Sequence, residues 1–203
     1  MRPALPRLHA ITDERIARRA DLEDVARALA IAGGANLALH ARGRALTGLE
    51  HYELASRLTA YAPACLFVND RLDIALALNA VGVQLGTGSL PVSAARRVRA
   101  AWWIGKSVHD LAEADAAKAE GADYLLVGPV YATASHPDRA PLGLETLGRI
   151  SELGLPVIAI GGIDPARARH AKAAGAYGAA AIRALWDAED PAGAGRRMLE
   201  ELQ

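Results

Sequence analysis

Short apolar segments alternate with longer amphipathic segments along the whole chain, and this alternation constrains the fold more than any other feature. The apolar segments have the length of strands and are too short for core helices. Because they are apolar throughout, they suit strands covered on both faces, as in a parallel sheet. Eight such strands are predicted, each followed by a helix: residues 8–12, 36–39, 64–68, 82–85, 102–105, 123–127, 156–160 and 177–182.

Strict alternation of this kind permits either a closed barrel or an open, doubly wound sheet, both with right-handed crossovers. The open sheet usually carries a glycine fingerprint after its first strand, and the segment after Ile11 has none. Four helices are predicted to end in a glycine-containing return, at Gly34, Gly121, Gly154 and Gly175. We therefore expect an α/β chain folded as a single (β/α)8 TIM barrel, with residues 1–203 as one domain.

Composition excludes several classes of partner. The 23 basic and 23 acidic residues give a net charge of zero, so neither nucleic acid nor a membrane surface is expected to bind. No apolar run approaches the roughly 18 residues of a membrane helix, and no signal peptide is recognised, so we expect a cytoplasmic protein. The single cysteine, Cys65, lies in an apolar run and is interpreted as a buried hydrophobic residue.

A glycine pair follows the seventh predicted strand, in the segment 159–164. Gly161 and Gly162 would let backbone N–H groups approach a phosphate, and Asp164 is positioned to cap the next helix. In TIM barrels the loops after strands seven and eight often form a phosphate site. Arg183, just past strand eight, is positioned to pair with the same phosphate. The alternatives are a tight turn at the glycines and a solvent-exposed Arg183.

Asn69 and Asp70 close the third predicted strand. Asp70 is able to ligate Mg2+, although both residue types also cap helices, and the sequence leaves these two interpretations open.

Histidines lie at several predicted strand ends, at His9, His40, His109 and His136. Imidazole titrates near neutrality, so a histidine facing a substrate is able to move protons without a metal. No spacing suggests zinc, and no transition metal is expected.

The chain resembles the thiamine phosphate synthase/TenI family along nearly its full length. Many segments in the same order carry the resemblance, and it implies a TIM barrel that binds a small phosphorylated thiazole substrate. Members of the family are commonly self-associated, so a homo-oligomer is a further expectation. The segments are residues 8–13, 68–75, 82–86, 105–109, 121–124, 128–133 and 156–163.

The family includes two activities, those of a synthase and of a thiazole tautomerase. Departures from the synthase pattern favour the tautomerase. The synthase joins a pyrimidine diphosphate to a carboxythiazole phosphate and uses Mg2+. Its second strand ends in Gln-x-Arg-x-Lys, where residues 38–42 here read Ala-Leu-His-Ala-Arg. Ser89 stands in place of its second metal-binding aspartate, and residues 133–136 replace its Thr-x-Thr-Lys. These departures predict a weakened diphosphate half of the site.

The resemblance therefore implies a TenI-like thiazole tautomerase, an isomerase that aromatises a carboxythiazole ethyl phosphate by acid/base proton transfer with no cofactor. The family's tautomerase histidine is replaced here by Pro129, so His136 or His40 is expected to move the proton. No metal ligand is expected, except Asp70 if the protein is a synthase using Mg2+. The expected substrate-binding residues are Asn69, Ser107, Thr133, Ser135, Gly162, Ile182 and Arg183.

The sequence also leaves open an entirely different phosphorylated ligand, and two further alternatives remain within the family. One is a true thiamine phosphate synthase in which Arg42 and His40 stand in for the missing cations. The other is a non-catalytic protein that binds thiazole or thiamine phosphates as a regulator.

Overall fold

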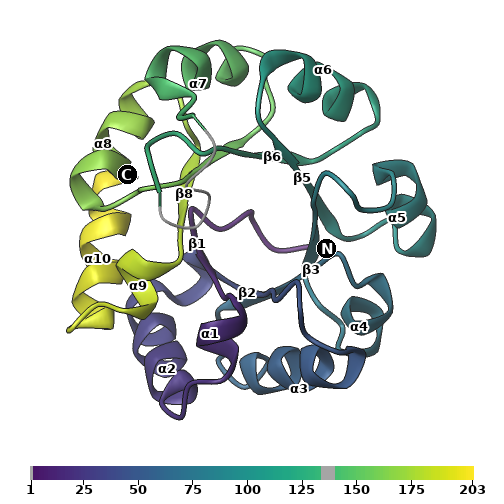
Figure 1. The fold of residues 1–203 in the computed structure, drawn as a ribbon, viewed down its shortest axis with the longest axis vertical. Coiled ribbons are helices and arrows are strands. Elements are labelled where there is room, and N and C mark those ends of the chain that lie inside the picture. Colours follow the sequence, from purple (N-terminus) through teal and green to yellow (C-terminus); the bar gives the residue numbers. More distant parts are fainter. Residues whose placement is uncertain (1, 134–139) are drawn as a thin grey trace.

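A computed structural model describes residues 2–133 and 140–203 and confirms the (β/α)8 TIM barrel. Neighbouring strands pair in parallel in sequence order, and β1 pairs with β8 to close the barrel. Helices surround the strands as an outer ring (Figure 1). The strands are β1 (Leu8–Ile11), β2 (Leu37–Ala41), β3 (Cys65–Asn69), β4 (Gly82–Leu85), β5 (Trp103–Val108), β6 (Tyr124–Val127), β7 (Val157–Ile160) and β8 (Gly178–Ala181).

The helices follow the predicted alternation, with short additions. Two four-residue helices, α1 after β1 and α9 after β8, were not predicted. A 3-10 turn, η1, precedes β2. The helices are α1 (Glu14–Ala17), α2 (Leu22–Gly33), η1 (Gly34–Asn36), α3 (Gly48–Leu58), α4 (Leu72–Ala77), α5 (Val92–Val98), α6 (Leu111–Ala119), α7 (Gly143–Ser151), α8 (Pro165–Ala173), α9 (Arg183–Trp186) and α10 (Pro191–Glu201).

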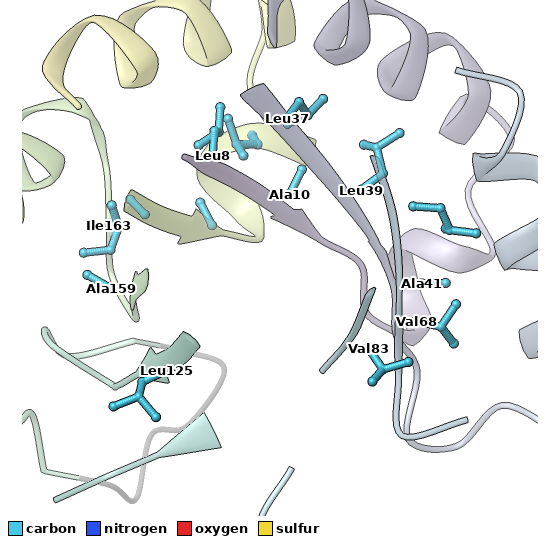
Figure 2. Close-up of a cluster of buried hydrophobic side chains, with 14 of the residues drawn as sticks. Leu8, Ala10, Leu37, Leu39, Ala41, Val68, Val83, Leu125, Ala159 and Ile163 are labelled. Carbon is cyan, nitrogen blue, oxygen red and sulfur yellow. The ribbon is translucent and has the colours of Figure 1, made fainter. Parts of the chain in front are cut away.

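The main core lies between the barrel and the helices. Alternate residues along each strand point outward into it, so Leu37, Leu39 and Ala41 of β2 pack with Leu8 and Ala10 of β1 (Figure 2). All five are almost completely buried. Burial of this apolar layer against the helices is the main force that holds the strands in register.

The barrel interior holds a second, smaller cluster that mixes apolar and polar side chains. Phe67 and Tyr124 fill its centre and meet edge to face, with ring centroids 6.1 Å apart. Gly105 makes room for them, because a Cβ atom there would overlap the Tyr124 ring. His9 and His40 lie beside Phe67 in the same layer. The interior is therefore a packed floor for anything bound above it.

The N-terminal segment crosses one end of the barrel (Figure 1). Leu5 is buried in the interior cluster, and its carbonyl accepts a hydrogen bond from the Tyr177 hydroxyl at 2.7 Å. Trp103 Nε1 donates to the Pro3 carbonyl at 2.9 Å. Arg7 donates to the carbonyls of Tyr177 and Leu202. This segment covers the N-terminal end of the strands, opposite their carboxyl ends.

Candidate active site

A cavity of about 1090 Å³ opens at the carboxyl ends of the strands. Residues that follow β2, β3, β4, β5, β6, β7 and β8 line it. Its position matches the end of the barrel at which active sites of this fold lie. The lining residues include two groups that bear on anion binding, one beside β7 and β8 around the Gly161–Gly162 turn and one beside β2 and β3 around Arg42 and Asp70.

The glycine pair adopts backbone conformations that favour glycine. Gly161 has φ of 100° and Gly162 has φ of 65°. A Cβ atom on Gly161 would lie 2.6 Å from the Pro129 Cα, and one on Gly162 would lie 2.8 Å from the Ala132 carbonyl oxygen. Tyr131 N donates to the Gly161 carbonyl at 3.0 Å, so the loop after β6 packs directly against this turn. The turn is left with bare backbone facing the cavity.

The structure brings several predicted phosphate ligands to the end of the cavity beside the Gly161–Gly162 turn. Gly162, Ile182 and Arg183 all line the cavity, and Ile182 and Arg183 form the start of α9. Arg167 was not predicted; it donates to the Gly162 carbonyl at 2.7 Å, and its guanidinium lies 4.7 Å from the centre of the Tyr131 ring. Its place five residues past Gly162, one turn into a capped helix, is the only signal for it in the sequence.

The loop after β6 contributes one predicted ligand to the wall. Thr133 lines the cavity. Two other expected residues, Ser135 and His136, lie outside the described residues.

The opposite end is built around Asp70, which follows β3. Asp70 has φ of 64°, a left-handed conformation that aspartate tolerates better than most residues. Its Oδ1 accepts hydrogen bonds from the Gly86 N–H at 2.9 Å and from the Ser89 hydroxyl. The sequence allows Asp70 either to cap a helix or to face the site; in the structure its side chain makes no cap hydrogen bond to α4 and lines the cavity with Asn69.

Three arginines, Arg42, Arg44 and Arg71, line the cavity at this end. Arg71 is paired with Asp73 at 2.5 Å, but the Arg42 guanidinium makes no hydrogen bond or ion pair within the described part of the chain. Burial, followed by the neighbouring charge of Arg44, lowers the pKa of Arg42. From the sequence we expect a weakened diphosphate half, whereas Arg42 and Arg44 place two positively charged side chains there. An unpaired, partly desolvated guanidinium favours binding of an anion.

His40 does not reach the cavity, contrary to its expected role as acid or base. Its side chain is completely buried in the barrel interior, behind Asn69. Burial lowers the pKa of His40 to about 4. A neutral imidazole without access to the cavity cannot exchange a proton with a bound substrate.

Two further polar side chains face the cavity from β5 and the residue after it. Ser107, predicted as a ligand, lines the wall and accepts a hydrogen bond from Gln84 Nε2 at 3.0 Å. His109 also lines the wall, and its Nδ1 lies 2.8 Å from Glu113 Oε2. It was not predicted from the sequence that Glu113, in the first turn of α6, orients His109, which lies just before the helix cap Asp110.

Acid should destabilise the fold through the buried histidine. The unfolded chain has an ordinary histidine pKa of about 6.5, whereas folded His40 has a pKa of about 4. The unfolded state then binds more protons, so this stability is fully present above the unfolded pKa and is lost as the pH falls toward the folded pKa. Between about pH 7 and pH 4.5, His40 should account for roughly 2–3 kcal/mol.

Urea unfolding at both pH values measures this loss, and the His40→Gln variant is the control. The variant should lose less stability on acidification by that amount. Equal losses in the two proteins would show that His40 is not the group responsible.

Within the part of the chain that the structure describes, no three His, Cys, Asp or Glu side chains cluster to hold a metal ion. None of the described helices is long and apolar enough to cross a membrane.

A family model described as thiamine monophosphate synthase matches residues 8–185. A thiamine-phosphate synthase of Chloroflexus aurantiacus is 41% identical over 197 residues, covering 95% of this chain and 90% of that protein. One of Methanoculleus marisnigri is 42% identical over 201 residues, covering 96% of this chain and 94% of its own length.

Solved structures share the barrel, and one of them also resembles the chain in sequence. A thiamine phosphate pyrophosphorylase of Pyrococcus furiosus superposes with a TM-score of 0.82 at 35% identity, covering 97% of this chain and 95% of that one. A 3-hexulose-6-phosphate synthase superposes with a TM-score of 0.74 at 18% identity, which reflects the shared barrel alone.

These relatives overturn the expectation of a thiazole tautomerase, and with it that of an isomerase. Proteins about 40% identical over nearly their full length are named synthases. The expectation depended on missing cations, whereas Arg42 and Arg44 line the cavity and Asp70 stands beside them.

Proposed function

The chain belongs to the thiamine monophosphate synthase family, and on that premise we propose that this enzyme is a transferase that joins a pyrimidine diphosphate to a thiazole phosphate. One observation carries the proposal: a single cavity has two separate ends suited to anions. The bare Gly161–Gly162 turn with Arg183 suits a monoester phosphate. Arg42 and Arg44 supply two positive charges at the other end, which suits a diphosphate.

Mg2+ is part of the proposal, and the residues beside Asp70 fit it. Asp70 Oδ1 is held by Gly86 and Ser89, while Oδ2 has no hydrogen-bond partner among the described residues. Mg2+ in phosphate-transfer sites is commonly held by one or two carboxylates together with substrate phosphates and water. Asp70 would be the carboxylate ligand, with the Ser89 hydroxyl beside it. When bound there, Mg2+ would neutralise charge on the diphosphate oxygens.

The chain's own residues would lower the barrier mainly by stabilising charge. In the transfer, the bond between the pyrimidine-bearing carbon and the diphosphate oxygen breaks, and its electron pair leaves on the diphosphate. The thiazole nitrogen supplies the electron pair of the new bond. Arg42 and Arg44 would oppose the negative charge that grows on the leaving group. The glycine turn and Arg183 would hold the thiazole phosphate so that its ring faces the reacting carbon.

The test is formation of thiamine phosphate from the two substrates with purified protein. We expect turnover that requires both substrates, and we expect chelation of Mg2+ to abolish it. Omission of either substrate is the control for contaminating phosphatases. Failure to form product at saturating substrates and Mg2+ would refute the proposal.

Gly162→Ala should raise the KM for the thiazole phosphate about 10-fold, since a 2.8 Å contact with the Ala132 carbonyl and a φ of 65° force the turn to move. The KM for the pyrimidine diphosphate should change little. Gly195→Ala is the matched control: it lies in α10, and its added Cβ would have ordinary contacts at 3.5 Å or more. Equal KM values for Gly162→Ala and the wild type would remove the turn from the phosphate site.

A further inference from the structure

A row of hydrogen bonds runs through the barrel interior to the wall of the cavity. His9 Nε2 lies 3.0 Å from the Pro6 carbonyl oxygen. His9 Nδ1 lies 2.8 Å from His40 Nε2, and His40 Nδ1 lies 3.1 Å from the side-chain amide oxygen of Asn69. Both imidazoles are completely buried, whereas Asn69 lines the cavity. The row therefore connects the covered end of the barrel with the ligand site.

The first member of the row determines the direction of every bond in it. The Pro6 carbonyl can only accept, so His9 Nε2 must carry a proton and donate it. A neutral His9 then has a bare Nδ1, which can only accept from His40 Nε2–H. A neutral His40 in turn has a bare Nδ1 facing Asn69. Two neutral imidazoles thus place an acceptor, and not a donor, against the asparagine amide.

Neutrality of both rings follows from their surroundings. Both rings pack on Phe67, and His9 also contacts the Tyr124 ring; among the described residues, neither imidazole makes a hydrogen bond or ion pair with an acidic side chain. Burial lowers the pKa of both histidines, that of His9 strongly. The positive charge of Arg42 also opposes protonation of His40 and lowers its pKa. An imidazolium in either position would be buried without a counter-ion.

The acceptor at His40 Nδ1 fixes the orientation of the asparagine. With the amide oxygen toward His40, two acceptors would face each other at 3.1 Å. A half-turn of the amide exchanges its oxygen and nitrogen without changing its shape, and the hydrogen-bond network decides between the two orientations. The network here requires Asn69 Nδ2 to donate to His40.

We propose that His9 and His40 are positioning residues that hold the Asn69 amide with Nδ2 toward the barrel interior and Oδ1 toward the cavity. Asn69 Oδ1 then presents a fixed acceptor to the ligand. It selects a heterocycle that offers an N–H donor at this point, and it disfavours one that offers a ring nitrogen lone pair. Identifying that ligand as an aminopyrimidine rests on the proposed function; the proton order itself does not.

Nitrogen-15 NMR of the wild-type protein tests the proton order directly. Spectra that correlate ring protons with ring nitrogens distinguish protonated from unprotonated nitrogens. We expect His9 and His40 both to carry the proton on Nε2, as should His51, whose Nε2 lies 2.9 Å from the Ala41 carbonyl and serves as an internal reference. A proton on Nδ1 of His40 or His9 would overturn the proposal without any variant. This readout requires neither substrate nor activity.

His9→Phe tests whether the row controls the ligand site. The substitution keeps a ring in the interior and removes the acceptor for His40 Nε2–H. We expect the His40 proton to move to Nδ1, the Asn69 amide to turn, and the KM for an aminopyrimidine diphosphate to rise about 10-fold or more. The KM for the thiazole phosphate should stay within about twofold. An unchanged His40 proton position in this variant would overturn the role of His9.

Phe67→Leu is the matched control, because Phe67 stacks on His40 with centroids 5.1 Å apart and makes no hydrogen bond to it. It should loosen the interior packing but leave the proton on His40 Nε2. If it moves that proton as His9→Phe does, packing and not the row sets the orientation. If the wild type shows the expected proton order but forms no thiamine phosphate, the proposed function fails and the inference about Asn69 stands.

Discussion

Asp70→Asn should reduce Mg2+-dependent turnover on the order of 10²- to 10³-fold, the range typical for loss of one charge-stabilising group at a reacting centre. Asp70 supplies the carboxylate on the cavity wall beside Arg42 and Arg44, and its Oδ1 also accepts from Gly86 N–H. An amide keeps the shape and one oxygen but loses the negative charge that a hard divalent cation requires. The apparent Mg2+ requirement should therefore shift to higher concentration.

The measurement is initial rate against Mg2+ concentration at saturating substrates. Asp115→Asn makes the same chemical change on an exposed turn of α6, away from the cavity, and should match the wild type. Wild-type turnover and an unshifted Mg2+ curve for Asp70→Asn would remove Asp70 from the metal site.

Arg42→Gln should lower kcat/KM for the pyrimidine diphosphate by about 10²-fold or more. Arg42 is half-buried and lines the cavity, and its guanidinium has no partner among the described residues. Most of its charge is therefore available to the ligand. Loss of a desolvated ion pair between Arg42 and the diphosphate would be costly. The effect on the KM for the thiazole phosphate should be small, because that substrate is proposed to bind at the other end.

Two further variants separate charge from geometry. Arg42→Lys keeps the charge but loses the planar fork, so it should recover only part of the activity. Arg27→Gln removes a guanidinium that is 61% exposed on α2 and should leave the kinetics unchanged. Full activity in Arg42→Gln would show that Arg44 or another cation holds the diphosphate.

Much of the fold is predictable because its signals are local. Thr47 and Glu50 form the reciprocal capping box that their spacing predicts at the start of α3. The predicted helix returns contain glycines with positive φ, including Gly121 and Gly154. The short helices α1 and α9 escaped prediction because four residues are too few to show a helical period.

The site was predictable only in part, because strand alternation and register decide which side chains reach it. Gly162 was found because a glycine pair after a strand is itself a signal. Arg42 was interpreted as part of a disrupted motif, although it and Arg44, two residues apart, both reach the cavity. His40, two residues before Arg42, points into the closed interior and not the cavity. The sequence shows which side chains alternate between the two faces of a strand. It does not show how far along the barrel axis each side chain lies, and so which ones reach the cavity.

The N-terminal segment that covers the barrel also has a consequence for the order in which the chain assembles during synthesis. Arg7 donates to the carbonyl of Leu202, 195 residues later, and β1 cannot complete its pairing until β8 is present. The first strand therefore leaves the ribosome with one open edge and must wait for nearly the whole chain. Contacts of such long range close slowly, so nascent chains expose an unpaired strand to which chaperones, or other nascent chains, are able to bind.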